Sequence, residues 1–174
     1  MIKPAFYRVL VAMEPGKEFS VDEIAEELRV TASTVKRYLR EIAKLGYVVD
    51  LDGKYMLSEK GELFRKSLVN LMEKKIEPSF GYVFTDPSTS SPVPVRVCSL
   101  EQLYIVAKYD LVPREILEHH LRAGYITSWV KEVLGDIDLA EKLSKEKDLN
   151  VDRFTELIEE RIKILESVRG IRRG

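Results

Sequence analysis

Helical periodicity dominates the hydrophobic pattern of the first half of this chain. Apolar residues recur at helical spacing in four segments, which predicts helices over residues 4–14, 21–29, 31–46 and 58–76. Before the last of these helices, two β-rich runs, residues 47–51 and 54–57, flank Asp52-Gly53. An Asp-Gly pair in this position is typical of a tight hairpin turn, because both residues tolerate positive φ. The first half therefore predicts three helices, a hairpin and a fourth helix.

The second half begins with a β-hairpin pattern and continues as helices. Residues 80–85 and 93–97 are β-rich, and the turn-forming segment 86–92 joins them. Pro94 lacks a backbone N–H, which places the second strand at the edge of its sheet. Capping residues and helical periodicity then predict helices that begin near Ser99, Pro113, Tyr125, Asp136 and Asn150.

The length of 174 residues is enough for two small domains. We expect the boundary at about residue 76, because Pro78 ends the long helix before it. The predicted fold is mainly α with a small amount of β structure. It combines an N-terminal domain, residues 1–76, with an α-rich domain, residues 77–174, that a short β-hairpin opens.

The segment Thr31–Gly46 predicts a helix with two chemically different faces. Apolar side chains fall on one side of this helix, and small polar and basic side chains on the other (Ser33, Arg37, Arg40 and Lys44). The segment has four basic residues and one acidic residue, whereas the whole chain has a net charge of −1. Any attraction for an anionic partner must therefore come from local charge. Such a helix is typical of nucleic-acid binding, and an ordinary solvated helix face is the simpler alternative.

The neighbouring segments favour the nucleic-acid interpretation. Ser20 and Glu23 predict a capping box at the start of the preceding helix, and Thr31 predicts the cap of the basic one. The preceding helix is acidic on its outer face, so it supports the basic helix rather than contacting phosphate.

The runs FSVDEIAEELRVTASTVKRYLREIAKLGYVV and GKYMLSEKG resemble the winged helix-turn-helix of bacterial and archaeal transcription regulators, over about residues 5–76. The resemblance implies that Thr31–Gly46 is a recognition helix. It implies that Ser33, Thr34, Lys36 and Arg37 face the DNA groove, that Arg40 and Lys44 meet phosphates, and that Lys54 lies at the wing tip.

From this resemblance we expect sequence-specific binding of double-stranded DNA by a transcription regulator. A bidentate contact of Arg37 with a guanine would discriminate by roughly 1–3 kcal/mol. Such regulators bind palindromic sites as dimers, so we expect a homodimer. The alternative is a protein–protein interaction module whose winged helix docks a partner in a larger assembly.

The run from Ser99 to Leu143 resembles a small, mostly archaeal domain family of unknown function, whose likeness covers about residues 80–165. Its pattern comprises Ser99 to Leu103, His120 to Gly124, Tyr125, Trp129, Val133 to Asp136 and Leu139-Ala140. The resemblance implies a fold module and supplies no activity. Dimerisation, sensing of a small-molecule effector and partner binding are the roles left open.

Residue types and motifs that are catalytic or bind metals in other proteins do not indicate an enzyme here. His119 and His120 are adjacent, so on a helix they point about 100° apart and chelate one metal poorly. Zinc-ligand spacings, nucleophile-elbow, dinucleotide-binding and Walker A motifs are absent from the sequence. We therefore expect a protein that is not an enzyme, with no cofactor and no metal. We expect a packed or hydrogen-bonded histidine and a Trp129 that anchors the core.

Two further features concern location and assembly. Cys98 is the single cysteine, and no apolar run is long enough to span a membrane, so we expect a cytoplasmic protein with no membrane partner. The last helix carries an apolar stripe that serves either its own domain or a dimer (Val151, Phe154, Ile158, Leu165 and Val168). The basic tail, residues 169–174, could add phosphate contacts.

Overall fold

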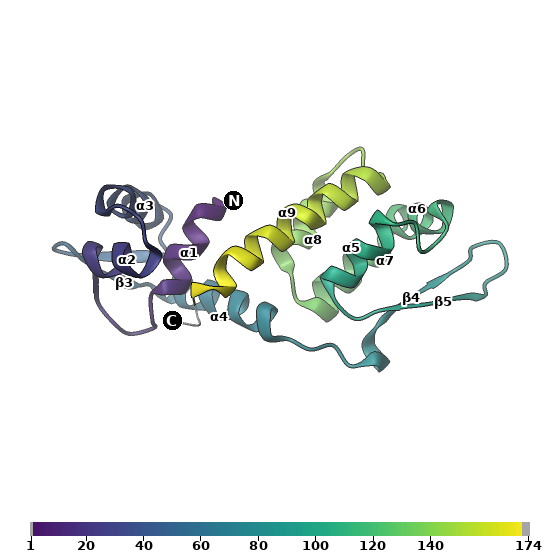
Figure 1. Ribbon diagram of the computed structural model, residues 1–174, viewed down its shortest axis with the longest axis horizontal. Coiled ribbons are helices and arrows are strands. Elements are labelled where there is room, and N and C mark those ends of the chain that lie inside the picture. The colour runs from purple at the N-terminus through teal and green to yellow at the C-terminus, as the bar shows by residue number, and fades with distance from the viewer. Residues whose placement is uncertain (1, 172–174) are drawn as a thin grey trace. The chain divides into compact units, whose positions relative to one another are not determined.

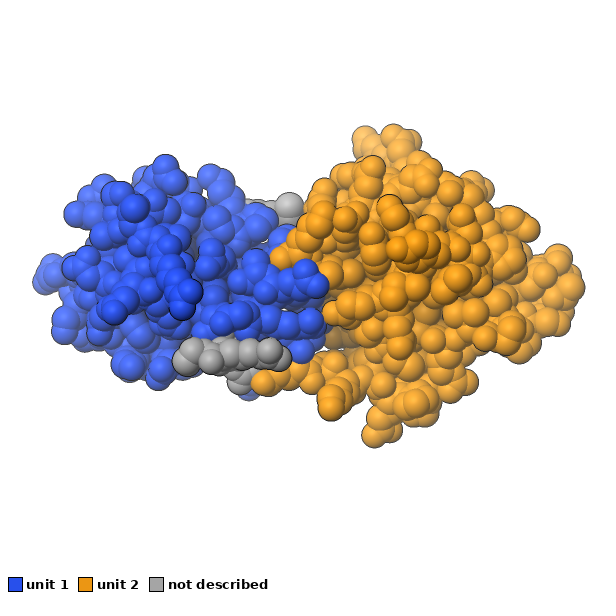
Figure 2. Space-filling view, in the orientation of Figure 1, with its two compact units in different colours: residues 1–72, 164–174 blue, residues 73–163 orange. Residues whose placement is uncertain are grey.

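The computed structural model describes residues 2–171 and is mainly helical, with small antiparallel sheets (Figure 1). The predicted fold class is confirmed at this level. The chain divides into two compact units (Figure 2). Within the described residues, the first unit holds residues 2–72 and 164–171, and the second holds residues 73–163. Residues 164–171 therefore belong to the first unit, whereas the sequence assigned them to the second.

The first unit contains the helices and the hairpin that the sequence predicts. Its elements are α1 (Pro4–Ala12), β1 (Phe19–Ser20), α2 (Val21–Leu28), α3 (Ala32–Lys44), β2 (Val48–Leu51), β3 (Lys54–Leu57) and α4 (Glu59–Glu73). The strands form one antiparallel sheet in the order β1–β3–β2. Two details differ from prediction: the short strand β1 was not expected, and α4 ends at Glu73 rather than near residue 76.

Local contacts explain where these elements begin and turn. The Ser20 N–H donates to Glu23 Oε2 over 2.7 Å, and the Glu23 N–H donates to Ser20 Oγ over 3.2 Å, which completes the predicted capping box of α2. Thr31 caps α3 as predicted. At the hairpin, Asp52 and Gly53 have φ of 54° and 95°, which is the two-residue turn expected of an Asp-Gly pair.

The second unit begins with a hairpin and continues as short helices. Its elements are η1 (Pro78–Phe80), β4 (Tyr82–Thr85), β5 (Pro92–Val97), α5 (Leu100–Lys108), α6 (Arg114–Arg122), α7 (Tyr125–Trp129), η2 (Val130–Leu134), α8 (Ile137–Lys145) and most of α9 (Val151–Arg169). The antiparallel pairing of β4 with β5 confirms the predicted hairpin. The helix expected over 125–135 widens into a π-helical turn at η2, and Pro113 precedes α6 instead of occupying its first turn.

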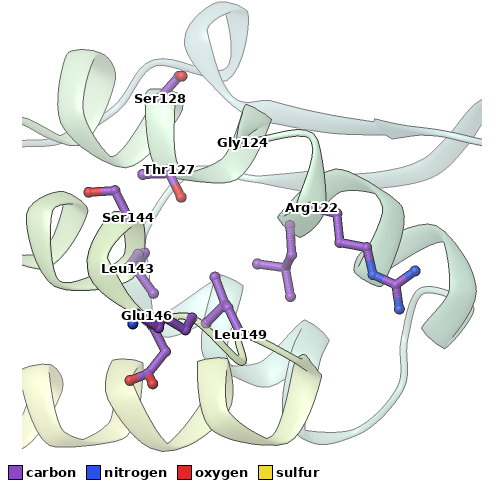
Figure 3. A pocket seen from close by; sticks show the side chains of 10 residues that line it. Arg122, Gly124, Thr127, Ser128, Leu143, Ser144, Glu146 and Leu149 are labelled. Atoms are coloured by element: carbon purple, nitrogen blue, oxygen red, sulfur yellow. The ribbon is translucent and has the colours of Figure 1, made fainter.

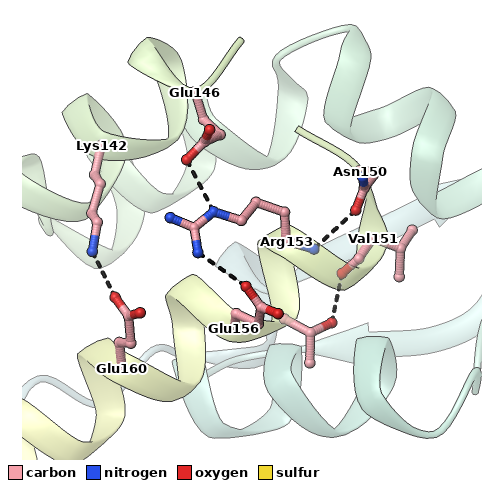
Figure 4. A network of polar contacts seen from close by, with 8 residues as sticks. Lys142, Glu146, Asn150, Val151, Arg153, Glu156 and Glu160 are labelled. Carbon is pink, nitrogen blue, oxygen red and sulfur yellow. Dashed lines mark hydrogen bonds and ion pairs between the residues drawn. The ribbon is translucent and has the colours of Figure 1, made fainter. Parts of the chain in front are cut away.

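Polar contacts join the two ends of the α8–α9 connection (Figure 4). Lys142 Nζ lies 2.7 Å from Glu160 Oε2, and Arg153 Nε lies 3.1 Å from Glu146 Oε2. Asn150 caps α9 as predicted, since its Oδ1 accepts from the Arg153 N–H over 2.9 Å. The four side chains of these pairs are 28–53% exposed, so solvent screens the pairs and each contributes little to stability. Together they define the path of the chain between the two helices.

The apolar stripe of α9 is buried within the chain. Each of its five residues is at most 5% exposed, namely Val151, Phe154, Ile158, Leu165 and Val168. Intrachain packing therefore accounts for this stripe, and α9 does not present it as a coiled-coil seam. Among the described residues, no helix combines the length and the apolar character needed to cross a bilayer.

Gly61 of α4 provides a test of packing in the first unit. A Cβ atom at this position would lie 2.0 Å from the backbone oxygen of Tyr47 and 3.2 Å from Leu57 Cδ2. Alanine favours a helix more than glycine does, but this overlap with the backbone outweighs the gain. We expect Gly61→Ala to lower the free energy of unfolding by about 1–3 kcal/mol in urea titrations.

Gly170→Ala is the matched control for this substitution, because a Cβ atom there meets open space. A Gly61→Ala variant as stable as the Gly170→Ala variant would contradict the described packing of α4 on the segment before β2.

Candidate nucleic-acid interface

Helix α3 is held in place by its apolar face and by its cap. Val35, Leu39 and Ile42 are fully buried and pack into the first unit. The Thr31 Oγ1 accepts from the Thr34 N–H over 3.3 Å, which satisfies one of the free donors at the helix start. The opposite face of α3 is therefore presented to solvent in a defined orientation.

The structure brings six of the seven predicted site residues onto this one helix. Ser33, Lys36, Arg37, Arg40 and Lys44 are exposed, and Thr34 is half-buried. The two hydroxyls at the helix start are engaged locally, since Thr31 Oγ1 lies 3.1 Å from Ser33 Oγ and 2.9 Å from Thr34 Oγ1. The four cations are thus the exposed charged groups of α3 that remain for a partner.

The acidic residue of α3 forms an ion pair with a lysine that is distant in sequence. Glu41 is half-buried, and Lys3 Nζ lies 3.2 Å from its Oε2. Lys3 precedes α1 and is 38 residues away in sequence, so no pattern along the chain could have identified it. The Lys3 and Glu41 side chains are 69% and 41% exposed, so the pair itself contributes little to stability. The positive charge of α3 comes from its four cations, which outnumber its one acidic residue.

Two cations on or near α3, Arg37 and Lys60, also contact aromatic rings. The Arg37 guanidinium carbon is 5.3 Å from the centre of the Tyr38 ring, a cation–π contact that restrains the side chain and leaves N–H donors for a partner. Beyond the end of α3, Lys60 Nζ donates to the Leu45 carbonyl oxygen over 2.8 Å and lies 4.2 Å from the Tyr47 ring. Lys60 is a second cation near α3 that the sequence analysis missed.

The seventh predicted residue, Lys54, begins β3 directly after the hairpin turn. Its Nζ lies 3.5 Å from Glu18 Oε2, an ion pair that the sequence did not indicate. The side chains of Lys54 and Glu18 are 62% and 51% exposed, and such pairs contribute little. A phosphate can therefore compete with Glu18 for this lysine.

Opposite charges meet at the base of the hairpin. Burial raises the pKa of the Tyr55 phenol, and the charge of Asp50 raises it further, whereas the charge of Arg40 lowers it. Asp50 Oδ1 also accepts from the Gly53 N–H over 3.0 Å. Asp50 thus serves the turn, and it is a negative charge close to the predicted DNA-binding residue of the hairpin.

The capping box at the start of α2, the helix before α3, predicts that stability depends on pH. The pKa of the Glu23 carboxyl lies below its ordinary value, chiefly because the Ser20 backbone N–H donates to it. A group whose pKa is lower in the folded state stabilises the fold above its unfolded pKa and loses this effect as pH falls through the folded pKa. We expect Glu23→Gln to destabilise the protein at pH 7 and to have a smaller effect near pH 3, as measured by urea unfolding.

Glu26→Gln is the control for this pH dependence, because Glu26 is an exposed carboxyl of the same helix that takes no part in the capping box. Equal effects of Glu23→Gln at both pH values would contradict the role assigned to Glu23.

In the second unit, the aromatic residues singled out by sequence have internal partners. The Tyr82 hydroxyl lies 2.5 Å from His120 Nδ1, and His120 Nε2 lies 2.9 Å from the Thr85 carbonyl oxygen. Burial raises the pKa of the Tyr82 phenol, so this group stays protonated beside His120. The Thr85 backbone N–H also lies 3.2 Å from His120 Nε2, so the imidazole has polar partners at both ring nitrogens. The expectation of a packed, hydrogen-bonded histidine is confirmed for the buried His120, whereas His119 is exposed.

Trp129 and Asp136 also have structural partners. Trp129 is 8% exposed, and its Nε1 donates to the Phe80 carbonyl oxygen over 2.9 Å, which confirms it as a core anchor. Asp136 caps α8 and accepts two hydrogen bonds from Arg161, 25 residues later, at 2.7 and 2.8 Å. Gly124 and Gly135 have positive φ, as sharp helix ends require. The contacts of His120, Trp129 and Asp136 and the backbone conformations of the two glycines thus have structural roles in the second unit.

Two findings complete the description of candidate sites. Within the described residues, no group of three or more histidine, cysteine and acidic side chains is arranged to hold a metal ion. Comparisons of the chain with protein-family models, with curated proteins and with solved structures find no match.

Proposed function

We propose that the protein binds double-stranded DNA through α3 and the β2–β3 hairpin, as a winged-helix transcription regulator. The observation that carries the proposal is the outer face of α3, where four exposed cations lie on a helix with one acidic residue, Glu41, which pairs with Lys3. The element order of the first unit and its sheet order β1–β3–β2 also support it, because both are typical of a winged helix.

The proposed contacts divide into base readers and phosphate binders. Arg37 has the donor geometry to contact a guanine edge in the major groove, and Ser33, Thr34 and Lys36 lie on the same turns. Arg40 and Lys44 lie further along α3 and would contact phosphates, as would Lys54 at the hairpin. A single copy offers few cations, so we propose that two copies bind a palindromic site with half-sites about one helical turn apart.

The test is a selection of bound duplexes from a random pool, followed by titrations of the selected duplex at several salt concentrations. Three phosphate contacts per copy predict that log K falls with log salt with a slope of about −3 per copy. We expect a palindromic consensus and this steep slope. Absence of measurable binding at low salt, or an affinity independent of salt, would refute the proposal.

A second candidate function is docking of a protein partner on the hairpin. Strand β2 is an edge strand whose Val49 and Leu51 are 42% and 39% exposed, and exposed apolar side chains at a sheet edge favour a protein contact. Under this alternative, Val49→Ser with Leu51→Ser abolishes capture of a stable partner, and the protein has no affinity for duplex DNA. Under the DNA proposal, this pair of substitutions leaves the salt slope unchanged.

A further inference from the structure

The second unit contains a cavity of about 480 Å³ that the proposed DNA contacts do not use (Figure 3). Its walls come from the end of α6 and the turn after it, from α7, from the end of α8, and from the segment that joins α8 to α9. The volume lies within the range of about 300–1,000 Å³ that is typical of small-molecule sites. All of its lining residues belong to residues 73–163, so the cavity is a feature of the second unit alone.

The cavity has an apolar side and a hydroxyl-bearing side. Leu121, Leu143 and Leu149 line the apolar side. Leu121 and Leu143 are 4% and 1% exposed, so the half-buried Leu149 is the lining leucine most open to a ligand. Thr127 supplies a hydroxyl group to the lining, whereas the Ser144 hydroxyl donates to the Ala140 and Glu141 carbonyl oxygens, each over 3.0 Å. Leucines beside a few polar groups are the combination expected of a site for a ligand with an apolar body and one polar end.

The charges around the cavity favour an anionic ligand. Glu146 is held by Arg153 Nε at 3.1 Å, and Arg122 is held by Glu118 at 3.2 Å. Lys147 also lines the cavity and makes no hydrogen bond or ion pair within residues 2–171. Lys147 is therefore the lining cation whose charge is not already balanced by a carboxylate of the described chain.

We propose that this cavity binds a small organic monocarboxylate. The apolar body of the ligand lies against Leu121, Leu143 and Leu149, and its carboxylate accepts from the Lys147 ammonium group. One uncompensated cation matches one negative charge, whereas a phosphate ester would need further donors, such as an unengaged arginine. The proposal does not depend on DNA binding, because its residues and its test lie entirely in the second unit.

Calorimetry measures binding at this site directly, and Trp129 provides a second, indirect reporter. It is the single tryptophan of the chain and lies on α7, two residues after the cavity-lining Thr127. We expect hexanoate and benzoate, added to the full-length protein, to change the Trp129 fluorescence saturably and to bind with one-to-one stoichiometry in calorimetry. Hexanol and hexylammonium match hexanoate in chain length but lack its negative charge, so they should bind at least tenfold more weakly.

Two variants and a matched control localise the binding. Lys147→Gln should weaken hexanoate binding about tenfold, because it removes a charge-assisted hydrogen bond. Leu149→Phe should weaken it as well, because the larger side chain narrows the cavity. Lys145→Gln is the control: Lys145 is exposed, lies 3.3 Å from Glu141 and does not line the cavity. It should leave the affinity unchanged.

Three results would overturn the proposal. One is that neither hexanoate nor benzoate binds saturably at millimolar concentration. The second is that hexylammonium binds as tightly as hexanoate. The third is that Lys147→Gln binds hexanoate with the affinity of the unmodified protein. The loss or retention of duplex DNA binding affects none of these results, so the two proposals can fail separately.

Discussion

Replacing Arg37 and Arg40 together with alanine is expected to lower the affinity for the selected duplex about a hundredfold per copy. The Arg37 guanidinium supplies the base-edge contact, and Arg40 supplies a phosphate contact on the same exposed face of α3. Loss of the phosphate contact should also make the salt slope shallower by about 1. Fluorescence anisotropy with labelled duplex at several salt concentrations measures both effects.

The control for this experiment removes the same charge from another place. Lys131 and Lys145 are exposed and belong to the second unit, so Lys131→Ala with Lys145→Ala changes the net charge equally without touching α3. This control should retain most of the affinity. If the double lysine variant loses as much duplex affinity as the double arginine variant, the attraction is non-specific. If the double arginine variant loses no affinity, α3 is not the binding element.

Single substitutions separate the two arginines by role. Arg37→Lys keeps the charge but loses the planar pair of donors, so it should relax the preference for one base pair and largely retain the salt slope. Arg40→Ala should weaken binding to all duplexes about equally. An unchanged base preference in Arg37→Lys would remove Arg37 from direct readout.

Arg161→Ala is expected to have the largest effect on stability, a loss of about 3–5 kcal/mol in the free energy of unfolding. Arg161 and Asp136 are 7% and 1% exposed, and their side chains make paired hydrogen bonds of 2.7 and 2.8 Å. Removing the arginine leaves the Asp136 carboxylate buried without its main compensation. Because Asp136 also caps α8, the loss extends to the start of that helix.

Urea unfolding followed by Trp129 fluorescence measures this effect, since Trp129 lies in the same unit. Arg153→Ala is the matched control: Arg153 also bridges acidic side chains but is 38% exposed, so its removal should cost less than about 1 kcal/mol. Asp136→Asn combined with Arg161→Met should cost less than Arg161→Ala, because asparagine retains the helix cap and no buried charge remains. Equal losses from Arg161→Ala and Arg153→Ala would contradict the assigned role of the buried pair.

Elements defined by neighbouring residues were predictable from the sequence. The capping box of Ser20 and Glu23, the caps at Thr31 and Asn150 and the Asp52-Gly53 turn all use contacts within a few residues. The two faces of α3 were predictable as well, because the helical repeat alone places Val35, Leu39 and Ile42 on one side.

Elements that depend on distant partners were not predictable in the same way. Strand β1 has two residues, and it exists because Phe19 and Ser20 pair with Tyr55 and Lys54. The widening of the chain into a π-helical turn at η2 likewise has no signal in the apolar spacing. Short elements carry too few residues for a periodic pattern, so their partners in space decide them.

The sequence by itself determined the order of the elements and the identity of the cationic face of α3. It did so because capping, turn formation and helical spacing are local properties of the chain. The tertiary structure alone decided which charges remain available: Lys3 compensates Glu41, Glu18 engages Lys54, and Arg161 compensates Asp136. It also decided that the end of α9 belongs to the first unit. The residues of these ion pairs lie 25 to 38 positions apart in the sequence. Only the packing of the folded chain brings them together.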